Sequence, residues 1–121
     1  MVKFAYNDRA GISAAFAFNL LARLNRDLQG NFDPEGFRYR ARWVPEASHI
    51  EMALVSQRAQ QVDVAGQRWC FTAGESLITE TSAKYSPEAF EALAAAAGWT
   101  PQARWSDGAG DLSLHLLVQA D

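Results

Sequence analysis

The chain has 121 residues, of which 49% are hydrophobic and 21% are charged, and its 11 Lys and Arg against 14 Asp and Glu give a formal net charge of -3. This composition excludes a disordered tail, and the single cysteine, Cys70, excludes a disulfide-stapled secreted scaffold. The acidic balance argues against a nucleic-acid partner, and no apolar run approaches the roughly 20 residues of a membrane span. We therefore expect a soluble, cytoplasmic protein with neither a membrane nor a nucleic-acid partner.

The first predicted element is an amphipathic helix over residues 11–28. Its apolar residues recur at every fourth position and are Ile12, Phe16, Leu20, Leu24 and Leu28. Ser13 is a candidate N-cap for this helix, and Gly30 is a candidate stop signal. The pair Asp33-Pro34 then predicts a single helical turn that leads into Phe37, because it combines an N-cap with a proline at the first helical position.

The middle of the chain is typical of antiparallel strands. Residues 37–43 alternate, with aromatic and small side chains on one face and three arginines on the other: Arg38, Arg40 and Arg42. Further strands are expected over 50–56, 61–64, 67–71 and 77–82, with turns at Ala65-Gly66 and Gly74-Glu75. The sequence predicts that these strands form an antiparallel meander.

A second helix is predicted over residues 86–98, since Ser86-Pro87-Glu88 supplies an N-cap, a proline and an early acidic residue. Two last strands, 99–106 and 112–118, flank a glycine-containing turn. The order of helix, antiparallel strands, helix and hairpin predicts an α+β fold.

Several familiar sites are absent from the sequence. His49, His115 and Cys70 have no metal-ligand spacing, so no metal site is expected, and no catalytic residue is assigned. The glycines at 108 and 110 join two strands and indicate a hairpin turn, while His115 between leucines is typical of a structural histidine. Single-stranded nucleic-acid binding would need arginines and aromatics on one surface, whereas alternation separates them and favours a solvated basic face.

Residues 79–85, Thr-Glu-Thr-Ser-Ala-Lys-Tyr, are the most informative segment. In an extended strand Glu80 and Ser82 project to the same side, roughly 7 Å apart. A carboxylate and a hydroxyl so placed can converge on a two-ended hydrogen-bonding ring such as imidazole. An exposed Glu and Ser on a sheet surface is the alternative that this spacing leaves open.

At this segment the sequence resembles the S-adenosylmethionine-dependent histidine Nα-methyltransferases of ergothioneine biosynthesis, also described as histidine-specific methyltransferases. The similarity covers essentially the whole chain. It is carried by AYNDRAGISAAFAFNLLARLNRDLQGNFDPEGF, IEMALVS, AGESLITETSAKYSPEAFEALAAAAGW and WSDGAGDLSLHLL.

The resemblance implies roles for four residues. Glu80 and Ser82 are expected to bind the two ring nitrogens of L-histidine, and Met52 is expected to form an apolar wall of the same pocket. Tyr6 is expected to help hold the amino-acid head group. For Met52 an ordinary core position is the alternative, and for Tyr6 a displaced position near the chain end.

The resemblance also implies a division of the chain. Residues 1–84 would be most of a substrate-recognition domain, and 85–121 the last helix and hairpin of a class I (Rossmann-like) methyltransferase sheet. Members of the family are two to three times longer, so this chain resembles a C-terminal portion. S-adenosylmethionine would be bound by the N-terminal half that is missing here.

For the complete enzyme the resemblance implies three successive methyl transfers to the α-nitrogen of histidine. A relative with another small amino-acid or imidazole substrate is one alternative, and a non-catalytic binding module without the cofactor half is another. An uncovered apolar face carrying Phe90, Leu93, Leu114 and Leu116 would also favour self-association.

Overall fold

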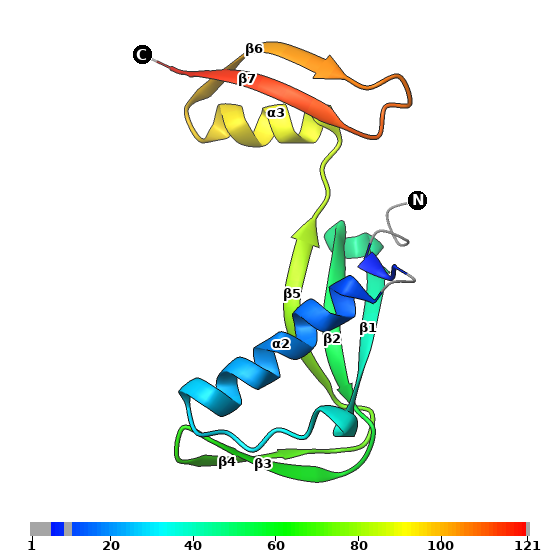
Figure 1. Ribbon diagram of the computed structural model, residues 1–121. Coiled ribbons are helices and arrows are strands. Elements are labelled where there is room, and N and C mark those ends of the chain that lie inside the picture. The colour runs from blue at the N-terminus through cyan, green and yellow to red at the C-terminus, as the bar shows by residue number, and fades with distance from the viewer. Residues whose placement is uncertain (1–5, 9–10, 121) are drawn as a thin grey trace. The chain divides into compact units, whose positions relative to one another are not determined.

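The computed structural model describes residues 6–8 and 11–120, which divide into two compact units, 1–83 and 84–121 (Figure 1). The elements of the first unit are, in chain order, α2 (Ile12–Asp27), η1 (Pro34–Gly36), β1 (Phe37–Val44), η2 (Pro45–Ala47), β2 (His49–Ser56), β3 (Gln60–Val64), β4 (Gln67–Phe71) and β5 (Ser76–Ala83). The second unit consists of α3 (Pro87–Ala96), β6 (Trp99–Ser106) and β7 (Ser113–Gln119). The chain is α+β with antiparallel sheets, as predicted.

The strands of the first unit do not form the predicted meander. A three-stranded antiparallel sheet has the order β1-β2-β5, and β3 pairs only with β4 in a separate hairpin. Because β2 is bonded on both edges, by β1 and by β5, it offers no edge to β3. The hairpin is therefore an insertion between two neighbouring strands of the sheet (Figure 1).

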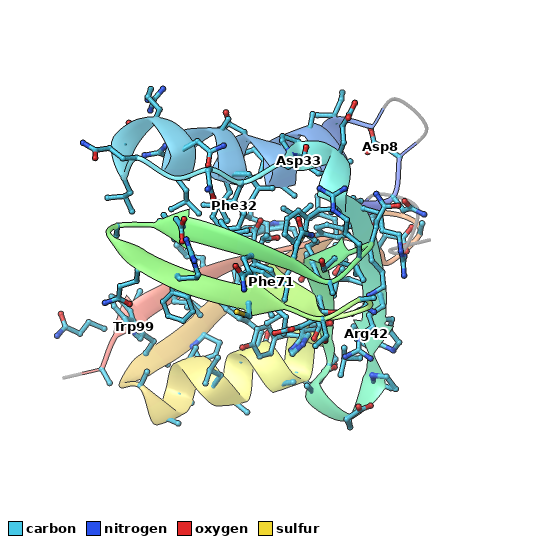
Figure 2. All side chains as sticks on the ribbon, turned by 90° about the horizontal axis from the view of Figure 1, so that it is seen from below. Asp8, Phe32, Asp33, Arg42, Phe71 and Trp99 are labelled. Carbon is cyan, nitrogen blue, oxygen red and sulfur yellow. The ribbon has the colours of Figure 1, made fainter. Side chains whose placement is uncertain are left out.

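The helix α2 lies across one face of this sheet, but with a different side buried than the sequence predicted (Figure 1). Leu21 is 0% exposed and Ala17 is also buried, whereas Ile12 and Phe16 of the predicted apolar stripe are 70% and 73% exposed. The main core contains Ala17, Leu21, Phe32, Phe37, Leu54 and Val62. Figure 2 shows Phe32 between α2 and the β3–β4 hairpin and Phe71 on the hairpin, and the centroids of the two rings are 6.4 Å apart. Most of the predicted apolar stripe, including Ile12 and Phe16, is therefore exposed on the surface of the first unit.

The first turn of α2 is capped by Asp8 and not by the predicted Ser13. The Asp8 carboxylate accepts hydrogen bonds from the backbone N–H groups of Ile12 (3.2 Å) and Ser13 (3.3 Å). Gly11 occupies the N-cap position with a φ of 69°, so Ser13 already lies inside the helix. The two backbone donors lower the pKa of Asp8, that of Ser13 being the larger cause.

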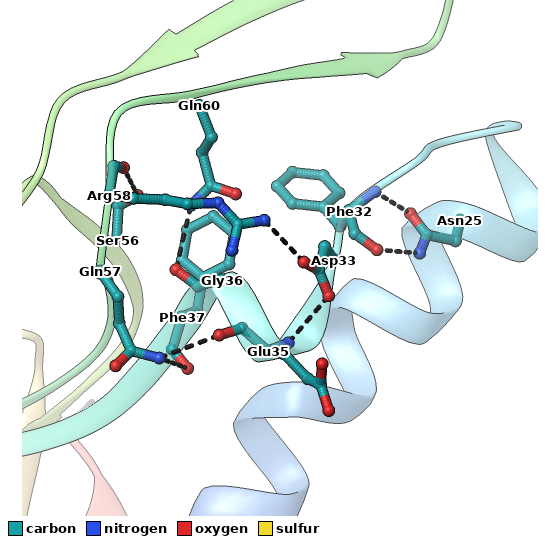
Figure 3. A network of polar contacts seen from close by, with 10 residues as sticks. All are labelled: Asn25, Phe32, Asp33, Glu35, Gly36, Phe37, Ser56, Gln57, Arg58 and Gln60. Atoms are coloured by element: carbon teal, nitrogen blue, oxygen red, sulfur yellow. Dashed lines mark hydrogen bonds and ion pairs between the residues drawn. The ribbon is translucent and has the colours of Figure 1, made fainter.

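The C-terminal end of α2 is held by Asn25. Its side chain accepts from the N–H of Phe32 and donates to the carbonyl of the same residue, both at 2.8 Å (Figure 3). The predicted stop, Gly30, does not supply the left-handed residue, because that conformation is taken by Gln29 with a φ of 52°. Gly30 is needed for space instead: a Cβ there would lie 2.8 Å from Asn25 Oδ1.

The predicted turn after Asp33-Pro34 is confirmed as η1. The Asp33 side chain accepts from the N–H of Glu35 at 3.1 Å, as an N-cap does, and forms an ion pair with Arg58 at 2.7 Å (Figure 3). The predicted hairpin turn at Ala65-Gly66 is also confirmed, with positive φ at both residues. These local signals were strong enough to fix the geometry from the sequence.

The arginines of β1 lie on the sheet face opposite to α2, where they meet a buried carboxylate. Glu51 is 7% exposed and accepts from Arg42 Nε at 2.8 Å and from Arg40 Nη2 at 3.4 Å. The aromatic face and the arginine face of β1 are separate, as the alternation predicted. Glu51 thus neutralises part of the positive charge that Arg40 and Arg42 place on this face of the sheet.

We expect acid to remove the stabilisation that Glu51 provides. Its pKa is lowered below the ordinary value of 4.5, chiefly by the hydrogen bond from Arg42. A carboxyl with a depressed folded-state pKa stabilises the protein fully above its unfolded pKa, and this contribution is lost as the pH falls through the folded value. Glu51→Gln should therefore reduce the free energy of unfolding at about pH 6 more than at about pH 3. Urea unfolding at both pH values checks this, with Glu35→Gln at an exposed carboxylate as the control, and an equal loss at both would contradict it.

In the second unit α3 packs on the β6–β7 hairpin (Figure 1). The predicted N-cap is confirmed, since Ser86 Oγ accepts from the N–H of Ala89 at 3.1 Å. The His115 ring lies 4.8 Å from the ring of Phe90, and its Nε2 is 2.8 Å from Ser113 Oγ. Residues 108–110 join two strands, as predicted.

None of the helices in the described part of the chain is long and apolar enough to cross a membrane.

Candidate functional site

The predicted pair Glu80 and Ser82 lies on β5, at the edge of the three-stranded sheet. Glu80 is opposite Met52 and Ser82 is opposite Ile50 in the antiparallel register. Residues directly opposite each other project to the same face, so Glu80, Ser82 and Met52 share the face that α2 covers. The antiparallel register therefore places the Glu80 carboxylate, the Ser82 hydroxyl and the Met52 thioether on one face of the sheet.

A β-bulge decides which face the pair occupies. The register shifts between Met52 and Ala53, so that Met52 pairs with Glu80 while Ala53 pairs with Ile78 and leaves Thr79 as the extra residue. Thr79 Oγ1 donates to the Met52 carbonyl at 3.2 Å and holds this irregularity in place. Beyond the bulge the side-chain alternation changes phase, which turns Glu80 and Ser82 toward α2 instead of toward the arginine face.

Tyr6 is brought to the same place from a distant part of the sequence. Its Oη lies 2.9 Å from Ser82 Oγ, and its ring packs on the buried cluster of Ala41, Ile50 and Met52. Its backbone carbonyl accepts a 2.7 Å hydrogen bond from Tyr39 Oη. All four residues that the resemblance pointed to thus lie in one region of the first unit.

Met52 is a buried residue that also lines a pocket. It is only 6% exposed and belongs to a hydrophobic cluster, and it also lines a pocket of about 110 Å³. The pocket lies between α2 and the edge of the sheet and is lined by Ser13, Phe16, Ala17, Leu20, Met52, Thr79 and Glu80. Its walls are mainly apolar, and Glu80 supplies a carboxylate.

The sequence reasoning missed the helix residues of this pocket. Phe16 and Leu20 were predicted only as apolar residues of an amphipathic helix, and Ser13 as its N-cap. The signal that could have identified them is the width of the apolar surface of α2, because Ala17 and Leu21 form a second stripe beside Phe16 and Leu20. One stripe enters the core, and the other is available to line a pocket.

Tyr39 was also missed, having been counted only among the aromatic residues of β1. Burial raises its pKa first of all, and the carboxylates of Asp8 and Glu80 raise it further. Its phenol therefore stays protonated and acts as a hydrogen-bond donor at neutral pH. The two carboxylates give this end of the sheet a negative potential, which suits ligands that present N–H groups.

The described residues contain no group of three or more His, Cys, Asp and Glu side chains that could hold a metal ion. The site is thus built from one carboxylate, hydroxyls and an apolar wall. Such an arrangement can bind and orient a small polar ring.

Comparison with known proteins identifies the relatives of this chain. The family model described as "Histidine-specific methyltransferase, SAM-dependent" matches residues 1–119. The histidine N-alpha-methyltransferases of Mycolicibacterium smegmatis and Mycobacterium tuberculosis are 43% and 41% identical to it over 117 residues. The N-methyltransferase benX of Aspergillus terreus is 29% identical over 119 residues.

The alignments cover nearly all of this chain but only part of each relative. With the two histidine N-alpha-methyltransferases they include 95% of this chain and 36% of the relative, and with benX 97% and 33%. The chain therefore spans about a third of the length of these curated relatives. Since the family model matches almost every residue, the chain belongs to the SAM-dependent histidine-specific methyltransferase family.

Proposed function

We propose that this chain forms the histidine-recognising part of a methyltransferase that transfers three methyl groups from S-adenosylmethionine to the α-amino nitrogen of L-histidine. The observation that carries the proposal is the common location of Glu80, Ser82 and Met52 on one sheet face, with Tyr6 bonded to Ser82. The names of the two histidine N-alpha-methyltransferases are consistent with this substrate.

The chemistry of the pair suits a neutral imidazole. Such a ring has one N–H donor and one bare nitrogen acceptor. The Glu80 carboxylate can only accept, so it takes the N–H end, and the Ser82 hydroxyl can donate to the bare nitrogen. The Tyr6 hydroxyl lies 2.9 Å from Ser82 Oγ. Tyr6 would then support the imidazole end of the site, and its role at the amino-acid head group stays a prediction.

This chain would contribute binding and orientation to the reaction. Met52 and the helix residues around it would enclose the ring on its apolar faces, and the polar pair would fix its rotation. A ring held in this way presents the α-amino group in one direction, and such alignment can contribute several kcal/mol to catalysis (on the order of 7–11 for ideal cases). No catalytic residue is assigned to the chain itself.

The two units would have separate tasks. We assign residues 1–84 to substrate recognition and residues 85–121 to the terminal helix and hairpin of a class I, Rossmann-like sheet. In support, α3 covers one face of the hairpin, which includes His115, while Leu114 and Leu116 project to the other face and are exposed. An exposed apolar sheet face is what a strand pair at the edge of a larger covered sheet would present.

We assign the binding of S-adenosylmethionine to residues outside this chain. The nucleotide part of this cofactor is commonly bound at a glycine-rich turn between a strand and a helix. Among the described residues, no positive-φ glycine lies in a turn that leads from a strand into a helix. Gly66, Gly74 and Gly110 lie between strands, Gly98 follows α3, and Gly11 precedes α2 with no described strand before it. We expect the 121-residue chain to show no saturable micromolar binding of S-adenosylmethionine in calorimetric titration. Saturable binding would contradict the assignment of the cofactor to residues outside this chain.

We also expect the 121-residue chain to self-associate. Of the four residues predicted on an uncovered face, Phe90 instead packs against His115, on the side of the hairpin that α3 covers. Leu93, Leu114 and Leu116 are at least 44% exposed, as are Trp99 and Trp105. Such surface favours contacts between copies. Sedimentation velocity at tens of micromolar should detect species larger than a monomer, and Leu114→Lys should reduce them. A clean monomer for the parent chain would contradict this expectation.

The proposed function is tested by substrate selection in the complete methyltransferase. Methyl transfer is followed by mass spectrometry with L-histidine, with L-phenylalanine, which lacks ring nitrogens, and with other amino acids. We expect trimethylated histidine and no product from phenylalanine. Efficient methylation of another small amino acid would show that this amino acid, and not histidine, is the substrate. The absence of any methyl transfer would favour a non-catalytic binding module.

A further inference from the structure

Tyr39 occupies a connecting position between the core and the candidate site. It lies on β1, opposite Leu54, and projects to the face covered by α2. Its ring packs against both hydrophobic clusters of the first unit. Its hydroxyl donates to the Tyr6 carbonyl at 2.7 Å, which is the usual distance for an O–H donor.

The strands β1 and β5 and the helix α2 each contact the segment from Tyr6 to Asp8. Tyr39 holds its backbone from β1, Ser82 meets its Tyr6 hydroxyl from β5, and Asp8 caps the start of α2. Because β1 and β5 are the two outer strands of the sheet, this segment spans the sheet over β2. The position of the Tyr6 hydroxyl is therefore set from the opposite edge of the sheet.

The contact between Tyr6 and Ser82 depends on this anchoring. A tyrosine side chain has few rotatable bonds, so fixing its backbone carbonyl largely fixes where its hydroxyl can reach. Without the Tyr39 hydroxyl the Tyr6 carbonyl loses its bond from β1, whereas the packing of Tyr6 on Ala41, Ile50 and Met52 remains. The ring of Tyr39 itself would remain in the core if only its hydroxyl were removed.

We propose that Tyr39 is a positioning residue for substrate recognition, which acts by holding the Tyr6 carbonyl so that the Tyr6 hydroxyl meets Ser82. The proposal rests on the proposed function of the Glu80 and Ser82 pair. Tyr39 would touch no substrate atom. Its contribution would pass entirely through Tyr6, and this distinguishes it from a residue that merely fills the core.

The test is a double-mutant cycle in the complete methyltransferase, with L-histidine and S-adenosylmethionine titrated separately. Tyr39→Phe removes the hydroxyl and keeps the ring, and we expect it to weaken histidine binding about threefold to tenfold without changing cofactor affinity. Tyr6→Phe should weaken histidine binding at least as much. In the Tyr6→Phe background, Tyr39→Phe should have no further effect, because the hydroxyl that it positions is gone. Tyr85→Phe, at an exposed tyrosine of the second unit, is the matched control.

The outcomes separate this inference from the proposed function. If the parent enzyme does not bind histidine, the proposed function fails and the inference fails with it. If the parent binds histidine and Glu80→Ala weakens binding, but Tyr39→Phe matches the parent or adds fully to Tyr6→Phe, only the inference is overturned. Tyr39→Leu is the second variant for the same cycle. Loss of folding in both variants would place Tyr39 in the core alone and would also overturn the inference.

Discussion

Glu80→Ala is expected to weaken the binding of L-histidine by about ten- to a hundredfold in the complete methyltransferase, while the affinity for S-adenosylmethionine stays near that of the parent. The physical reason is the loss of a hydrogen bond to a charged acceptor, which is typically worth about 1.5–3 kcal/mol. Ser82→Ala should have the same effect in a milder form, because it removes a neutral donor. Paired calorimetric titrations of the two ligands measure both variants.

Thr81→Ala is the matched control for this prediction. Thr81 lies between Glu80 and Ser82 on the same strand but pairs with Glu51, which places it on the arginine face of the sheet. A substitution there should leave histidine affinity unchanged if the effect is specific to the face under α2. If histidine binds to the Glu80→Ala variant as tightly as to the parent, or if both ligands weaken in parallel, the assignment of the site is wrong.

Leu21→Ala is expected to lower the free energy of unfolding by about 2–5 kcal/mol, the range for a large core side chain replaced by alanine. Leu21 is fully buried and belongs to the main cluster with Phe32, Phe37 and Leu54. Truncation removes the apolar contacts of Leu21 with this cluster and leaves a cavity between α2 and the sheet. Urea unfolding followed by circular dichroism measures the change.

Ile12→Ala is the control on the same helix. Ile12 belongs to the apolar stripe of period four that the sequence predicted, but it is largely exposed in the structure. Its replacement should change the free energy of unfolding by no more than about 0.5 kcal/mol. An Ile12→Ala variant that is destabilised as strongly as Leu21→Ala would restore the sequence-based assignment of the helix face. Both variants must be compared at one protein concentration, because association would add to the apparent stability.

Local signals correctly predicted the turn η1 and the N-cap of α3. Asp33 and Ser86 each accept a hydrogen bond from a backbone N–H two or three residues ahead, and each precedes a proline. Such contacts lie within one turn of the chain, so their geometry follows from neighbouring residues alone. The N-cap of α2 was missed because its acceptor, Asp8, lies before Gly11 and outside the expected position.

The buried side of α2 could not be derived from periodicity. Ile12, Phe16 and Leu20 form one stripe of period four, and Ala17 and Leu21 form another stripe that begins about 100° further around the helix. Both stripes satisfy the pattern of an amphipathic helix. Only the sheet against which α2 packs selects the second stripe for the core and leaves Phe16 and Leu20 to line the pocket.

By itself, the sequence determined the α+β class, the positions of most elements and, through its motifs, the resemblance to the methyltransferase family. The tertiary structure alone decided that β2 pairs with β5, that the β3–β4 hairpin lies outside the sheet, and that a bulge at Thr79 turns Glu80 and Ser82 toward α2. It also brought Tyr6 and Tyr39 to this pair. The reason is physical: caps and turns depend on hydrogen bonds between near neighbours, whereas strand partners, bulges and buried faces depend on contacts between residues far apart in the chain.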